Sequence, residues 1–249
     1  MAELKTKPTV ALQLWSVNQV IPKDVRGTLK KIAGMGYKGI ECAGYYGLSG
    51  KDIRGMLDEF GMVCVGSHVG LDLLEGDKFE QTVATNKALG TDRLIVPGAD
   101  LSNMPKLIER LNAAHVKAKA AGMRVGFHNH TKEFELVDGK TKFDMIFSQT
   151  PADFLMQVDI GWAYHAAQDV PALLRKYAKR LETVHVKEFS KEKKCVVVGA
   201  GDIKWPPLFE LMEKETAIKT YVIEQEQFTV GPMESVKECF DNMRKMGQV

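Results

Sequence analysis

Eight short apolar runs recur along the chain, and their first residues lie 24 to 38 positions apart. The runs are rich in β-branched residues, which is typical of buried strands. Between them, apolar residues follow helical spacing, as at Val25, Leu29 and Ile32. The strands predicted from these runs are 9–14, 38–41, 62–68, 93–96, 124–128, 154–159, 182–186 and 220–224.

Regular alternation of strand and helix predicts parallel strands joined by crossover helices. Runs such as 94–96 and 125–127 are apolar on both faces, which indicates a sheet buried on both sides. Eight such units in 249 residues favour a (β/α)8 barrel that forms a single domain over 1–249, because these barrels commonly need about 250 residues. An open, doubly wound sheet is the alternative. The glycines expected to end helices are Gly34, Gly36, Gly61, Gly90 and Gly122.

The charge balance argues against nucleic acid as a partner. The 34 Lys and Arg residues face 32 Asp and Glu residues, for a net charge of +2, and they are spread along the chain. A protein that tracks phosphates usually carries a concentrated basic surface. Every apolar run is also interrupted well before the about 18 residues of a membrane span, so no membrane partner is expected. The start of the chain does not read as an export signal, which predicts a cytoplasmic protein, or a periplasmic one if a signal has been removed.

Polar residues concentrate at the carboxyl ends of the predicted strands. In (β/α)8 enzymes this rim carries the active site. The rim residues are Gln13, Glu41, His68, His128, His130, Asp159, His185, Lys187, Glu188, Glu224 and Glu226.

Four of these residues suggest a metal centre. His128, Asp159, His185 and Glu224 end four successive strands, and neighbouring strands lie about 4.8 Å apart, so the side chains can converge. A mixed nitrogen and oxygen shell suits one Mn²⁺, Co²⁺, Zn²⁺, Fe²⁺ or Mg²⁺ ion. Each residue also has a simpler interpretation, as a hydrogen-bonded rim residue or, for Glu224, as a partner of Lys187.

Other rim residues suit a carbohydrate ligand. Trp15, Tyr45 and Trp162 follow strands and could pack on a sugar ring, although aromatic residues there also simply close a barrel mouth. The predicted substrate-binding residues are Gln13, Trp15, Glu41, Tyr45, His68 and Trp162.

Several longer segments resemble the sugar phosphate isomerase/epimerase group of the xylose isomerase-like TIM barrels. They are VALQLWSV, TLKKIAGMGYKGIECAGYYG, GSHVGLD, VGFHNHTKEFE, VDIGWA, HVKEF, GAGDIKW and YVIEQE, and they run nearly end to end. Similar proteins include inosose dehydratases, hydroxypyruvate isomerases, ketose 3-epimerases and 3-keto-glycoside lyases.

The resemblance implies a divalent metal held by Glu, Asp, His and Glu from strands 5 to 8. Asp159, His185 and Glu224 match the last three positions, whereas His128 stands where many relatives have Glu. The resemblance also implies that the two glutamates exchange protons with the substrate. With His128 present, Glu224 remains a candidate base, and the second proton carrier is sought among His128, His130, His68, Glu133 and Lys187.

The leading hypothesis is therefore a metal-dependent isomerase or epimerase of a keto-sugar or polyol that acts through an enediolate. A lyase or dehydratase of the inosose dehydratase or 3-keto-glycoside lyase type is the alternative enzyme, and a non-catalytic sugar-binding barrel is the alternative of another class. An apurinic endonuclease would need more metal ligands and a basic groove. The resemblance also leaves a homo-oligomer open.

Overall fold

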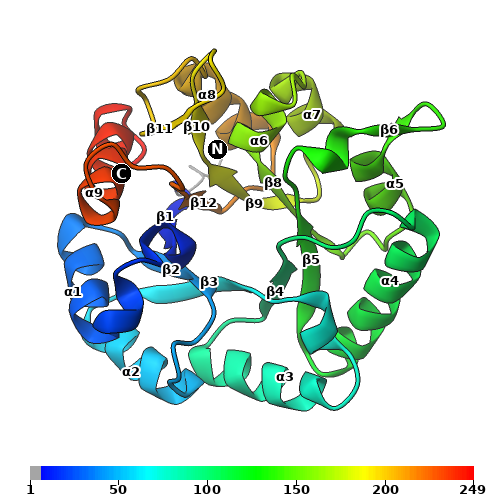
Figure 1. The fold of residues 1–249 in the computed structure, drawn as a ribbon, viewed down its shortest axis with the longest axis horizontal. Helices are drawn as coiled ribbons and strands as arrows, with labels where there is room; N and C mark the ends of the chain where they lie inside the picture. The colour runs from blue at the N-terminus through cyan, green and yellow to red at the C-terminus, as the bar shows by residue number, and fades with distance from the viewer. Residues whose placement is uncertain (1–6) are drawn as a thin grey trace, which may run out of the picture.

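The barrel closes where its first strand pairs with its last. The computed structural model describes residues 7–249, and within them eight parallel strands form a closed barrel in the order β1-β12-β9-β8-β5-β4-β3-β2 (Figure 1). The barrel strands are β1 (Thr9–Gln13), β2 (Gly39–Ala43), β3 (Val63–His68), β4 (Arg93–Val96), β5 (Arg124–His128), β8 (Leu155–Asp159), β9 (Leu181–Val186) and β12 (Thr220–Ile223). The predicted (β/α)8 barrel is thus confirmed, and the open sheet is excluded.

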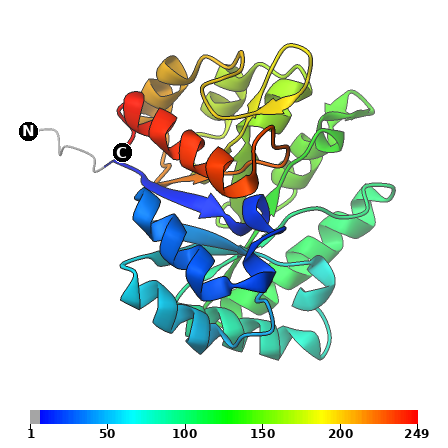
Figure 2. The ribbon, with the colours of Figure 1, turned by 60° about the vertical axis from the view of Figure 1, so that its left-hand side comes forward.

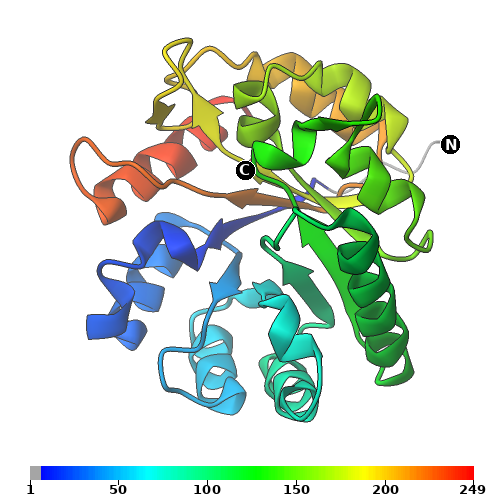
Figure 3. The same cartoon turned by 45° about the vertical axis from the view of Figure 1, so that its right-hand side comes forward.

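Helices surround the barrel in both views of Figures 1 and 3. The α-helices are α1 (Val25–Met35), α2 (Gly50–Glu59), α3 (Lys78–Leu89), α4 (Met104–Ala120), α5 (Lys142–Ser148), α6 (Ile160–His165), α7 (Val170–Lys176), α8 (Trp205–Glu215) and α9 (Pro232–Lys245). Short 3-10 helices are η1 (Leu14–Val17), η2 (Ile21–Lys23), η3 (Leu71–Leu74) and η4 (Lys132–Phe134). Among the described residues, no helix is both long enough and apolar enough to cross a membrane.

Helices α1 and α9, from opposite ends of the described chain, pack side by side next to β1 (Figure 2). The Tyr37 and Phe240 rings lie 4.7 Å apart between centroids, and the Tyr37 hydroxyl donates a hydrogen bond of 2.8 Å to the Val236 carbonyl. These buried contacts join α9 to the connection between α1 and β2, and so stabilise the closure of the barrel.

The predicted boundaries were largely accurate. Strands β4 and β5 have the expected limits, whereas β12 ends at Ile223, so that Glu224 lies just beyond it. Gly34 does not end the first helix, because α1 continues to Met35 and ends at Gly36 with φ 113°, in the left-handed region that favours glycine.

Two small antiparallel hairpins were not predicted. They are formed by β6 (Leu136–Val137) with β7 (Lys140–Thr141) and by β10 (Glu188–Phe189) with β11 (Cys195–Val196). Both are insertions after barrel strands and lie at the side where the strands end.

Candidate active site and metal centre

Strand alternation and register bring the rim residues together. Gln157 and Asp159 are two positions apart on β8, so both side chains point to the same face of the sheet. Across the strand pairs, His128 of β5 is in register with Gln157, and Asp159 is in register with His185 of β9. Gly161 lets α6 approach closely, because a Cβ there would lie 2.5 Å from the Lys187 carbonyl oxygen.

The four residues expected to bind a metal form one buried cluster. His128, Asp159, His185 and Glu224 each offer a ligand atom, and these atoms lie within 4.8 Å of one another. Asp159 Oδ1 accepts a hydrogen bond of 2.7 Å from the Trp162 amide at the start of α6. Among the described residues, the buried Asp159 Oδ2 has no hydrogen-bond partner.

His185 and Lys187 supply positive charge to this cluster. His185 Nδ1 lies 3.0 Å from Glu224 Oε2, and its Nε2 lies 2.7 Å from Glu41 Oε2. Lys187 Nζ lies 2.9 Å from Glu224 Oε2 and 3.4 Å from Asp159 Oδ2. The expected pairing of Glu224 with Lys187 is therefore present, and it occurs within the cluster.

These contacts shift the ionisation of the paired groups. Burial opposes the charge of His185, but Glu41 and Glu224 outweigh burial and raise its pKa to about 10. Burial likewise opposes the charge of Lys187, whose pKa is nevertheless raised by Glu224 and Asp159. The pKa of Glu224 is well below its usual value, because Lys187 and His185 outweigh its burial. Glu224 is thus a carboxylate at neutral pH.

The pKa values of Asp159, His128 and His130 shift in the direction that burial favours. Burial raises the pKa of Asp159 to about 6, against the opposing effect of Lys187. Burial, with the nearby His185 and His68, holds the pKa of His128 well below its usual value. Burial also lowers the pKa of His130. Both His128 and His130 are therefore neutral imidazoles at pH 7.

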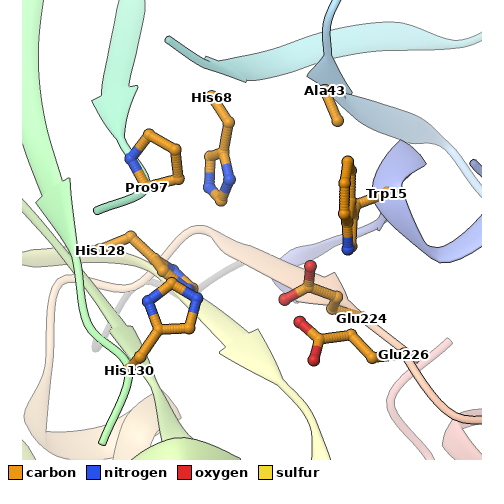
Figure 4. A pocket seen from close by; sticks show the side chains of 8 residues that line it. All are labelled: Trp15, Ala43, His68, Pro97, His128, His130, Glu224 and Glu226. Carbon is orange, nitrogen blue, oxygen red and sulfur yellow. The ribbon is translucent and has the colours of Figure 1, made fainter. Parts of the chain in front are cut away.

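A cavity of about 290 Å³ opens directly above this cluster. Figure 4 shows the imidazoles of His68, His128 and His130 on one side and the carboxylates of Glu224 and Glu226 across from them, with Trp15 at the edge. A second cavity, of about 730 Å³, shares His130 with the first. It is bounded by residues 98–102, by residues 130–133 with Glu135, and by Lys142 and Trp162.

The predicted substrate-binding residues fall in three places. Trp15 and His68 line the cavity above the cluster, and Trp162 lines the adjoining one. Gln13 and Glu41 are buried and line neither cavity; instead, Gln13 Nε2 donates a hydrogen bond of 2.8 Å to Glu41 Oε2.

Tyr45 departs from the expected contact with substrate. It lines a separate cavity with residues of α2 and α3, and its hydroxyl accepts a hydrogen bond of 2.8 Å from Asn86 Nδ2. The structure does not bring Tyr45 into the barrel mouth.

Two polar residues contact the site although the strand-end pattern assigned them no role in it. Gln157 is fully buried and contacts His68, His128 and Glu41, although it was not among the rim residues. A usable signal was its position two residues before Asp159 in an otherwise apolar strand. Glu226 was on the rim but had no assigned role; it lines the cavity and lies 2.8 Å from Lys187 Nζ.

The residues present fit a divalent cation. Two carboxylates and two imidazoles converge in a buried space, and the buried Asp159 Oδ2 accepts no hydrogen bond from the described residues, with Lys187 Nζ 3.4 Å away. Mixed nitrogen and oxygen ligands suit a first-row divalent ion or Mg²⁺.

The comparison with protein families agrees with this geometry. The family model described as the xylose isomerase-like TIM barrel matches residues 29–246. The chain belongs to the xylose isomerase-like TIM barrel family. The earlier resemblance to this family is thereby confirmed.

Two solved structures superpose closely on the chain. One sugar phosphate isomerase/epimerase from Parabacteroides distasonis has a TM-score of 0.85 at 21% identity and covers 100% of this chain and 97% of its own. A second, also from Parabacteroides distasonis, has a TM-score of 0.83 at 25% identity and covers 96% of this chain and 98% of its own.

Curated relatives of this xylose isomerase-like protein include inosose dehydratases. One from Clostridium perfringens is 26% identical over 140 residues, which are 49% of this chain and 46% of the relative. One from Mesomycoplasma hyopneumoniae is 25% identical over 183 residues, 65% of this chain and 59% of the relative. The chain thus spans only about half the length of the curated relatives it matches.

Proposed function

We propose that this protein is a divalent-metal-dependent isomerase or epimerase that moves the proton next to the carbonyl of a keto-sugar or related polyol. The observation that carries the proposal is the opposition of Glu224 to the histidines across a small cavity, directly above a buried cluster suited to a metal. His128, Asp159, His185 and Glu224 would hold the ion. When bound, the ion would act as a Lewis acid that polarises the substrate carbonyl.

Glu224 is the proposed base. Its Oε2 is held by His185 and Lys187, which keep the carboxylate ionised. Among the described residues, no hydrogen bond occupies Oε1, which leaves this oxygen to accept a substrate proton. Lys187 is fully buried and does not line the cavity, so we assign it a positioning role through Glu224.

His130 is the proposed second proton carrier. It lines the cavity opposite Glu224, and its neutral imidazole can accept or return a proton. The buried carboxylate of Glu133 accepts a hydrogen bond of 2.8 Å from the His130 amide and thereby fixes the backbone that carries this ring.

Trp15 and His68 are the proposed substrate contacts at the mouth, because both line the cavity. Trp15 is 52% exposed, which suits a residue whose ring packs on one face of a sugar. Trp162 would contact the part of a substrate that extends into the adjoining cavity.

Proton exchange tests the proposal directly. Protein loaded with Mn²⁺ is incubated with a panel of keto-sugars in D2O, and deuterium at the carbon next to the carbonyl is measured by NMR. We expect incorporation that EDTA abolishes and that Glu224→Gln lowers by about 10² to 10⁴ fold. Sugar binding without exchange across the panel would instead support the non-catalytic barrel.

Elimination is the second candidate. Three observations favour it: His128 stands where the family resemblance expects a glutamate, the curated relatives are inosose dehydratases, and the cavity beyond His130 has room for a leaving group. The same incubations separate the two reactions. A lyase yields an unsaturated ketone with loss of a β-substituent, whereas an isomerase or epimerase yields a sugar that keeps all its substituents and gains only deuterium.

A further inference from the structure

The Gln157 side chain connects one predicted metal ligand to the carboxylate beneath the site. Its Oε1 lies 3.2 Å from His128 Nδ1 and 2.9 Å from His68 Nε2. Its Nε2 donates a hydrogen bond of 2.7 Å to Glu41 Oε1. Gln157 and Glu41 are both buried, so these contacts are shielded from water.

Glu41 determines which way the Gln157 amide points. Glu41 Oε2 accepts from Gln13 Nε2 at 2.8 Å and lies 2.7 Å from His185 Nε2, so the carboxylate is surrounded by donors. An ionised carboxylate only accepts hydrogen bonds, and therefore the Gln157 amide group must face it. The reverse orientation would place two acceptor oxygens 2.7 Å apart. The Gln157 oxygen consequently faces the histidines.

This orientation specifies the proton position on the His128 imidazole. The Gln157 oxygen cannot donate, so His128 must donate from Nδ1, and its Nε2 is left with the lone pair. His185 differs, because both of its nitrogens face carboxylates: Nε2 lies 2.7 Å from Glu41 Oε2, and Nδ1 lies 3.0 Å from Glu224 Oε2. A ring nitrogen binds a metal only through its lone pair.

We propose that Glu41 and Gln157 form a buried positioning pair that fixes the tautomer of His128, so that its Nε2 is the nitrogen that binds the metal. The inference rests on the metal centre of the proposed function and deepens it. A carboxylate can bind through either oxygen, whereas an imidazole must be held in one tautomer. His128 occupies the place of a carboxylate in the family resemblance, so this chain needs a partner such as Gln157 to fix the ring.

The first test measures the affinity for Co²⁺ by calorimetry in the wild type and in Gln157→Leu. Outer partners of histidine ligands are typically worth about 10 to 100 fold in metal affinity, and we expect a loss of that size. The matched control is Gln225→Leu. Gln225 is equally buried, but its amide donates to the Gln227 carbonyl and touches no histidine, so Co²⁺ affinity should stay at the wild-type level. Unchanged affinity in Gln157→Leu would overturn the proposal.

The second test reads the tautomers without metal. In ¹⁵N-histidine NMR spectra of the metal-free wild type, we expect His128 protonated at Nδ1, and we expect a mixture of tautomers in Gln157→Leu. A wild-type His128 protonated at Nε2 would overturn the proposal. If Gln157→Leu does not fold, Gln157→Asn serves instead, because it keeps the amide but withdraws it from the rings. A wild type that binds no Co²⁺ would refute the metal centre of the proposed function, while the NMR result would still decide the tautomer.

Discussion

The Lys187 ammonium group lies among three carboxylates, which makes its removal a sensitive test of the cluster. Its Nζ is 2.9 Å from Glu224 Oε2, 3.4 Å from Asp159 Oδ2 and 2.8 Å from Glu226 Oε1, and the side chain is fully buried. Lys187→Met keeps a chain of similar length and removes the charge. Two buried carboxylates then lose their nearest cation.

The size of the effect follows from this burial. Removing one partner of a buried ion pair typically costs about 3 to 5 kcal/mol. In a domain of this size, each kcal/mol lowers the Tm by about 2 to 4 °C, so we expect a decrease of about 6 to 20 °C. Differential scanning calorimetry in EDTA measures it. The control Lys237→Met removes an exposed lysine paired with Asp241 and should leave the Tm close to the wild type.

Added metal provides the second part of the same experiment. A divalent cation brought into the cluster supplies the missing positive charge, so Mn²⁺ should raise the Tm of Lys187→Met more than that of the wild type. A Tm within about 2 °C of the wild type in EDTA would refute the reasoning, because the carboxylates would then not depend on Lys187.

Three further outcomes are expected. His128→Ala should weaken Mn²⁺ binding if His128 is a ligand; loss of turnover with full metal occupancy would make it a proton carrier instead. Because the pKa of His185 is raised to about 10, its ring is protonated at pH 8, and metal binding at that pH should release about one proton. Calorimetry in two buffers with different enthalpies of ionisation measures this release, and a binding enthalpy that does not depend on the buffer would contradict it. The metal affinity should also rise with pH towards 10. Trp15→Ala should raise KM because Trp15 lines the cavity, whereas Tyr45→Phe should leave KM unchanged because Tyr45 lies elsewhere; equal effects would contradict the assignment.

The fold was predictable because each repeat contains two recognisable patterns, one for its strand and one for its helix. A strand buried on both faces must be apolar throughout, and a helix that covers it must be apolar on one side. Residues 94–96 and α4 illustrate both patterns, and eight repetitions leave little room for another topology. The hairpins of β6 with β7 and β10 with β11 are too short to show periodicity. For the hairpin of β6 with β7, the sequence signal was the Asp138-Gly139 pair, which is typical of a tight turn; both residues have positive φ.

The cluster was predictable because strand ends meet at one rim of the barrel. The depth at which each side chain lies, and the direction in which it points, were not predictable. The prediction ended the second strand at Glu41, but β2 continues to Ala43, and the Glu41 side chain is held beneath the cavity by Gln13, Gln157 and His185. Tyr45 follows the same strand, and the turn through Tyr46 and Gly47, both at positive φ, accompanies its placement against Asn86. Such directions depend on contacts between residues far apart in the sequence.

Metal stoichiometry tests the central claim most directly. Purified protein is dialysed against Mn²⁺, and bound metal is measured by mass spectrometry in the wild type, Asp159→Ala, His185→Ala and Glu224→Ala. The account predicts about one ion per wild-type chain. It predicts little or none in the three variants, because each removes one member of the buried cluster. Full occupancy in all three variants would contradict it.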